Sequence, residues 1–208
     1  MKGLLLKDFY VIQDSLLMLF IIFVVTGAAM AFLISPWILM SITTTTLSII
    51  VITTIQNDKS TQWNKFSATL PISRIQIISS KYCLYLLLCA MGVVLGLIVS
   101  VSAAILKSNF DINSLLLNLY LAIIASLIPG SISIPCSFLI EEEKIIVGIV
   151  LSYIATAVLL IGFTSILRHF INMEDNMNLV YGIITVVSVV VYLLSWLICP
   201  KKLCNRDI

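Results

Sequence analysis

Six long runs of apolar residues alternate with short polar stretches along the chain. Each run has about the 20 residues that a helix needs to cross the hydrocarbon core of a bilayer. None of the 12 Lys and Arg or the 10 Asp and Glu falls inside a run. A charge at mid-bilayer costs at least about 2.5–3.5 kcal/mol. The pattern therefore predicts six transmembrane helices, at about residues 16–35, 37–56, 82–106, 115–139, 145–167 and 179–199.

The composition argues against a water-soluble fold. Of the 208 residues, 61% are hydrophobic and 11% are charged, whereas soluble domains average about a quarter charged. We therefore predict an all-α polytopic membrane protein, with residues 1–208 forming a single transmembrane domain in a lipid bilayer. The net charge of +2 gives no field that would attract nucleic acid.

The basic residues predict the orientation. If the first span begins inside the cell, ten of the 12 Lys and Arg lie on the inner side, and Lys107 and Arg168 lie outside. This positive-inside bias predicts that both termini are cytoplasmic. Ala29-Met30-Ala31 has the small-residue pattern of a signal-peptide cleavage site, but the segment before it carries Asp8 and Asp14, which a signal peptide disfavours.

Residues 1–15 precede the first span and mix apolar with charged positions. Such a segment is typical of an interfacial elbow helix, which lies in the headgroup layer with its apolar side toward the lipid. The alternative is a cytoplasmic extension of the first transmembrane helix.

The longest predicted cytoplasmic connection, residues 57–81, has a pattern of its own. Asn57 or Asp58 is expected to cap a short helix, which Pro71 ends after Leu70. Ser73-x-x-Gln76 matches a capping box that begins the helix leading into the third span. One face of the short helix carries Trp63, Phe66 and Leu70. That face fits either a docking surface for another protein or an anchor in the headgroups.

Several polar residues lie inside the predicted spans. They are Thr43, Thr46 and Thr53 in the second span and Asn118 in the fourth. Threonine can bond to its own helix backbone in lipid. These residues therefore fit either a weakly polar wall of a translocation path or ordinary helix packing, while Asn118 can also bond across helices.

Glycine and proline add two predictions about the helices. Gly92-x-x-x-Gly96 in the third span permits close approach of another helix. Pro129 and Pro135 are expected to bend the fourth span, because proline lacks the N–H that its helix requires.

The chain lacks the residues of most catalytic and ion-driven mechanisms. It has no G-x-x-x-x-G-K-[ST] phosphate loop. The predicted spans contain no ionisable Asp, Glu, Lys, Arg or His that could exchange protons or cations. The single histidine, His169, cannot form a multi-histidine metal site. We therefore expect no enzyme, no metal and no cofactor in this chain, and any uphill transport must draw its energy from another subunit.

The loop 57–81 resembles the first cytoplasmic loop of type-2 ATP-binding-cassette (ABC) exporter permeases. The resemblance rests on Asp58-Lys59-Ser60, Trp63, Phe66, the Thr69-Leu70-Pro71-Ile72-Ser73-Arg74 segment and Lys81-Tyr82. It is nearest to small bacterial six-span permeases of the phenol-soluble-modulin and peptide-exporter kind. The span number, the elbow helix and the chain length are similar as well.

The resemblance implies a division of labour. A separate ABC ATPase subunit would bind ATP and Mg, and this chain would pair with a second copy or a paralogue in the bacterial cell membrane. The resemblance places a coupling helix at about residues 58–69 and a smaller contact at 141–144, where a glycine common in the family is missing. The implied coupling residues are Asp58, Lys59, Trp63, Phe66, Leu70, Pro71, Arg74, Glu142, Glu143 and Lys144.

We therefore predict a permease subunit that couples ATP hydrolysis by its partner to export of an amphipathic substrate, such as a peptide or toxin. A non-transporting scaffold, assembly factor or sensor is the alternative, and a passive channel is a second one. Export and immunity-type extraction of a peptide from the membrane are equally compatible with the sequence.

Overall fold

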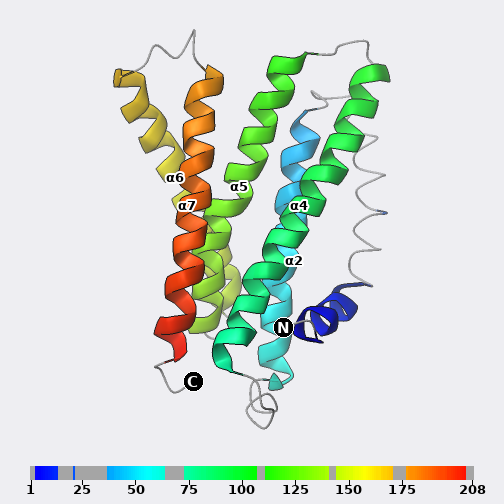
Figure 1. Cartoon of the computed structure of the whole chain (residues 1–208), viewed down its shortest axis with the longest axis vertical. Helices are drawn as coiled ribbons and strands as arrows, with labels where there is room; N and C mark the ends of the chain where they lie inside the picture. The colour runs from blue at the N-terminus through cyan, green and yellow to red at the C-terminus, as the bar shows by residue number, and fades with distance from the viewer. Residues whose placement is uncertain are drawn as a thin grey trace.

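In a computed structural model, the chain forms long helices that stand side by side and alternate in direction (Figure 1). The structure describes residues 3–13, 21, 37–63, 73–106, 111–140, 144–170 and 177–204. The first predicted span, residues 16–35, lies outside the described residues except for Ile21, which is helical.

Five of the described helices are long and apolar enough to cross a membrane. Their existence confirms the second to sixth predicted spans as helices. Several helices extend beyond the predicted spans: α2 continues past Gln56, α4 begins well before Tyr82, and α7 continues past Cys199. The helices are α2 (Ile38–Ser60), α4 (Arg74–Leu106), α5 (Ile112–Leu139), α6 (Ile145–Phe170) and α7 (Met177–Cys204).

Helix α2 packs against both α4 and α5, and α7 packs against α5 and α4. Helix α6 contacts α5 and α7 and lies at the edge of the bundle (Figure 1). A short N-terminal helix, residues 3–13, lies beside one end of α2 and α4. We call this end, where α2 and α7 also terminate, the basal end (bottom of Figure 1), and the opposite end the apical end.

The outward surface of the bundle is strongly apolar. Ile161 of α6 is 67% exposed and Val186 of α7 is 65% exposed, and many other large aliphatic side chains on these helices are exposed as well. Water would be a poor solvent for such a surface, whereas lipid acyl chains match it. The chain is therefore a multi-pass membrane protein.

Two glycines of α4 bring this helix against α2. A Cβ built on Gly92 would lie 2.8 Å from Thr44 Cα, and one built on Gly96 would lie 2.8 Å from Met40 Cα. The backbones of the two helices are therefore so close that no larger residue fits at either glycine. This confirms that the Gly92-x-x-x-Gly96 pattern serves close helix approach.

The prolines of α5 lie inside the helix and leave backbone carbonyls without their usual donors. Pro135 cannot donate to the Ser131 carbonyl one turn earlier. The Ser195 hydroxyl of α7 donates to that oxygen instead, at 2.7 Å. Near Pro129, the Tyr85 hydroxyl of α4 donates to the Ser126 carbonyl at 2.5 Å. The Ser195 bond thus satisfies the carbonyl that Pro135 leaves without a donor in an apolar interior, and the Tyr85 bond ties α4 to α5 close to Pro129.

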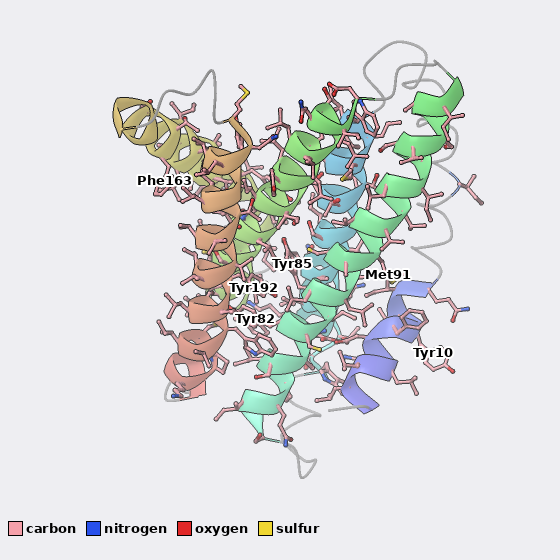
Figure 2. All side chains as sticks on the ribbon, turned by 45° about the horizontal axis from the view of Figure 1, so that its top comes forward. Tyr10, Tyr82, Tyr85, Met91, Phe163 and Tyr192 are labelled. Carbon is pink, nitrogen blue, oxygen red and sulfur yellow. The ribbon has the colours of Figure 1, made fainter. Side chains whose placement is uncertain are left out.

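Tyrosines fill the interior between α4 and α7. Figure 2 shows Tyr82, Tyr85 and Tyr192 directed into the bundle, and all three are almost completely buried. The Tyr192 hydroxyl donates to the Tyr82 carbonyl at 2.9 Å, and the Tyr82 hydroxyl lies 2.9 Å from Ser195 Oγ. Each buried phenol therefore has a hydrogen-bond partner, as a low-dielectric interior requires.

Asp111 caps the N-terminus of α5 at the apical end. Its carboxylate accepts a hydrogen bond of 2.6 Å from the Ser114 hydroxyl and one of 3.1 Å from the Asn113 N–H. These two bonds hold the pKa of Asp111 below its ordinary value. The cap explains why the helix begins here, before the apolar run.

Candidate functional site

Four charged side chains meet at the basal end, and we call them the basal ion cluster. They are Lys7 and Asp8 of the N-terminal helix, Asp58 of α2 and Lys81 of α4. The cluster joins three helices that are far apart in sequence. Two positive and two negative charges make it neutral, so that it can lie close to apolar surroundings.

Lys81 is the centre of the cluster and is only 3% exposed in its side chain. Its ammonium lies 2.9 Å from Asp8 Oδ1 and 2.6 Å from Asp58 Oδ2. It also donates to Thr54 Oγ1 at 3.2 Å. An ammonium has three N–H donors, so these three acceptors satisfy it completely.

Lys7 completes the cluster from the other side. It pairs with the second carboxylate oxygen of Asp58 and lies 3.5 Å from Asp8 Oδ1. Its ammonium also lies 4.1 Å from the centroid of the Trp63 ring, within the range of a cation–π interaction. Asp58 therefore bridges the two lysines, and Lys7 reaches the residues that follow α2.

Helix α2 ends in a turn that redirects the chain. Its last helical residue is Ser60, and Gln62 has a φ of 53°, in the left-handed region. The Gln62 N–H donates to the Lys59 carbonyl at 2.9 Å, a bond that belongs to helix C-terminal caps of this kind. Trp63 is helical again directly after the turn.

Lys59 links the end of α2 to the end of α5. Its ammonium donates to the Ile140 carbonyl at 2.6 Å and to the Phe138 carbonyl at 3.3 Å. The last carbonyls of a helix lack intrahelical donors and carry partial negative charge. Lys59 therefore caps α5 just before residues 141–144, the second loop that was implicated by resemblance.

The expected helix cap at Asn57 or Asp58 is wrong. Both residues belong to the last turn of α2, and the Asn57 carbonyl accepts the Thr61 N–H at 3.0 Å. The helix continues because Lys59 in its last turn suits the negative end of the helix dipole. The break comes at residues 61–62 instead, one turn later than expected.

The structure brings together three of the predicted coupling residues, Asp58, Lys59 and Trp63. Lys144 directly precedes α6 and is exposed. Arg74 begins α4, and its side chain lies outside the described part. Outside the described residues lie Phe66, Leu70, Pro71, Glu142 and Glu143.

The capping box that begins α4 is confirmed. The Gln76 N–H donates to Ser73 Oγ at 3.4 Å, and the Ser73 N–H donates to Gln76 Oε1 at 3.4 Å. Each side chain thus satisfies a backbone donor of the other residue, which is the defining pattern of the motif. The helix that carries Lys81 into the bundle therefore starts at a fixed point.

The polar residues considered for a translocation path bond to their own helices. Thr43 donates to the Leu39 carbonyl and is buried beside α4. Thr46 donates to the Ile42 carbonyl at 2.9 Å, and Thr53 to the Ile50 carbonyl at 2.7 Å. Asn118 donates to the Ser114 carbonyl at 2.8 Å, within α5.

Sequence reasoning missed Lys7, Asp8 and Lys81 as members of a site. A usable signal was present in the N-terminal helix. Leu4, Asp8 and Ile12 are four residues apart and are all buried, so they share one face. An aspartate between two aliphatic residues on a buried face requires a cationic partner. Lys81, just before the third predicted span, was a candidate for that partner.

A family model described as ABC-2 family transporter protein matches residues 3–203 of the chain. No curated protein and no solved structure matches the chain. The matched range begins with the N-terminal helix, includes the whole basal ion cluster and ends in the last turn of α7.

Proposed function

Because the chain belongs to the ABC-2 family of transporter proteins, we propose that it couples ATP hydrolysis by a separate ABC ATPase subunit to export of an amphipathic substrate. The family makes the chain a membrane permease subunit of an ABC transporter, and permeases of this family normally pair with an ATPase. The basal end, with α2, the turn after it and the start of α4, is the proposed coupling site.

The distribution of charge supports an external energy source. The middle of α2, α4, α5, α6 and α7 contains no Asp, Glu, Lys, Arg or His. An ion-driven transporter needs ionisable groups within the membrane to bind its coupling ion. In the described helices the buried charges gather at the basal end, where a cytosolic subunit can reach the surrounding loops.

The observation that carries the proposed coupling site is that two adjacent residues at the end of α2 join it to three other helices. Asp58 joins the N-terminal helix and α4, and Lys59 joins the end of α5. A partner that pushes on the segment after α2 therefore acts on several helices at once. Such a push fits rigid-body motion of helices as the transport step.

An amphipathic substrate suits the interior of the bundle. The buried side chains of the described helices are mostly aliphatic, and threonine, serine and tyrosine hydroxyls are the mild polar component. A peptide toxin or lipid-like molecule would match this chemistry better than a small ion would. In the proposed assembly, two permease chains, identical or paralogous, work with two ATPase subunits that hold ATP and Mg, in a bacterial cell membrane with both termini cytoplasmic.

Copurification tests the proposal. We expect the tagged chain, coexpressed with an ABC ATPase encoded by a neighbouring reading frame, to retain that ATPase after solubilisation. Trp63→Ala should weaken retention by about tenfold or more, as loss of an aromatic contact at the centre of an interface does. Phe163→Ala, an aromatic substitution in the apical half of α6, is the matched control. If the wild-type chain retains no ATPase and instead behaves as an isolated scaffold or channel, the proposed function is wrong.

A further inference from the structure

Lys7 contacts the chain on both sides of the break after α2. Before the break it pairs with Asp58, and beyond the break its ammonium lies over the Trp63 ring. The intervening turn includes Gln62 in the left-handed region, where a residue other than glycine is uncommon. A cation that holds both sides of such a turn fixes the direction in which the chain leaves α2.

The N-terminal helix that supplies Lys7 is itself held by a buried ion pair. Asp8 and Lys81 each have a side chain that is 3% exposed, and Lys81 Nζ lies 2.9 Å from Asp8 Oδ1. Leu4 and Ile12 are buried on either side of Asp8. Apolar contacts alone would allow this helix to slide, whereas a buried charge pair has one favoured register. Figure 2 shows Tyr10 on the opposite face, directed away from the bundle.

We propose that Lys7, Asp8, Asp58 and Lys81 are positioning residues that make the N-terminal helix and the end of α2 move as one body with the segment that begins at Trp63. The inference rests on the proposed function, because the ATPase that binds the segment after α2 is what moves it. Motion of the segment after α2 is then carried to the N-terminal helix through Lys7 and to α4 through Lys81. Lys59 transmits the same motion to the end of α5.

Lys7 is the most accessible lysine of the basal ion cluster. Its side chain is 26% exposed, against 3% for Lys81, so its removal disturbs the fold less. Lys7→Met keeps the length and the apolar stem but loses both the ion pair and the cation–π contact. Lys7→Arg keeps the charge and serves as the rescuing variant. Lys201→Met removes an exposed basal charge outside the cluster and is the matched control.

The experiment measures the distance between two spin labels and the rate of ATP hydrolysis in the reconstituted complex of the chain with its ATPase. Spin labels at Tyr10→Cys and Ser60→Cys, both exposed positions, are introduced after the five native cysteines have been replaced. With Lys7 present, we expect one narrow distance distribution that is the same without nucleotide and with trapped ATP. In Lys7→Met we expect a broader, nucleotide-dependent distribution and a kcat of ATP hydrolysis reduced about fivefold or more, with the KM for ATP unchanged. Asp58→Asn should give the same loss, and Lys7→Arg should restore both readings.

The outcomes separate the two proposals. If no ATPase accompanies the wild-type chain, the proposed function fails. If the ATPase is present but Lys7→Met and Asp58→Asn leave the label distance and the kcat as in Lys201→Met, the inference alone is overturned. A label distance that already changes with nucleotide in the wild-type cluster would overturn it as well, since the two helices would then move separately.

Discussion

Gly92→Ala is expected to lower the midpoint of thermal unfolding of the purified, detergent-solubilised protein by about 2–12 °C. The added methyl group would lie 2.8 Å from Thr44 Cα, and the atom it meets is backbone that cannot rotate away. Overpacking of this kind costs typically about 1–3 kcal/mol, and each kcal/mol lowers the midpoint by about 2–4 °C in a chain of this size. Gly96→Ala should behave in the same way against Met40.

The chain supplies a matched control for this substitution. A Cβ added at Gly162 of α6 meets no atom within 4 Å. Gly162→Ala should therefore leave the unfolding midpoint unchanged or raise it slightly, because alanine favours the helix by up to about 1 kcal/mol. Equal midpoints for Gly92→Ala and Gly162→Ala would show that α2 and α4 do not approach as closely as described.

Lys81→Met should be the most destabilising single change at the basal end. It leaves the buried carboxylate of Asp8 and that of Asp58 to share Lys7 as their remaining cation in the cluster. Removing one partner of a buried ion pair typically costs about 3–5 kcal/mol, because the remaining charge stays buried without compensation. Thermal unfolding of the solubilised protein measures the loss.

Two further variants identify the cause of that loss. Combining Lys81→Met with Asp8→Asn removes the uncompensated carboxylate and should recover part of the stability. Lys201→Met removes an exposed lysine of α7 and should change the free energy of unfolding by no more than about 0.5 kcal/mol. Equal unfolding midpoints for Lys81→Met and Lys201→Met would show that the buried ion pair does not stabilise the fold.

The helical architecture was largely predictable because it depends on local chemistry. A run of apolar residues long enough to cross a bilayer has to be helical, since lipid offers no partners for the backbone. The described helices α2, α4, α5, α6 and α7 therefore fall where hydrophobicity places them. The Gly92-x-x-x-Gly96 pattern and the Ser73–Gln76 capping box were equally local, and both have the geometry that was expected.

The end of α2 was predicted too early because charge was treated as a helix boundary. Charges limit the part of a helix that lies in lipid, but they do not end the helix itself. Asp58 and Lys59 continue α2 because each has partners there: Asp58 has two lysines, and Lys59 has the carbonyls at the end of α5. The elbow and coupling roles of the flanking segments remain predictions of the sequence.

The basal ion cluster was not predictable from local pattern. Lys7 and Asp58 are 51 residues apart in the sequence, and Asp8 and Lys81 are 73 apart. Such pairs form only when the N-terminal helix, α2 and α4 are packed together. A hydrophobicity profile treats each of these residues as an isolated charge beside a span, and it contains no information about which charges meet.

If energy enters at the basal end, as we propose, that end must face the cytoplasm. Labelling of single cysteines by a membrane-impermeant maleimide on intact cells tests this most directly. Ser60→Cys lies at the basal end of α2 and Ile112→Cys at the apical start of α5, and both positions are exposed. In a background without the native cysteines, we expect Ile112→Cys to react on intact cells and Ser60→Cys to react only after the membrane is opened. Reaction of Ser60→Cys on intact cells would rule out energy input at this end, because no cytosolic ATPase could then reach the turn that follows α2.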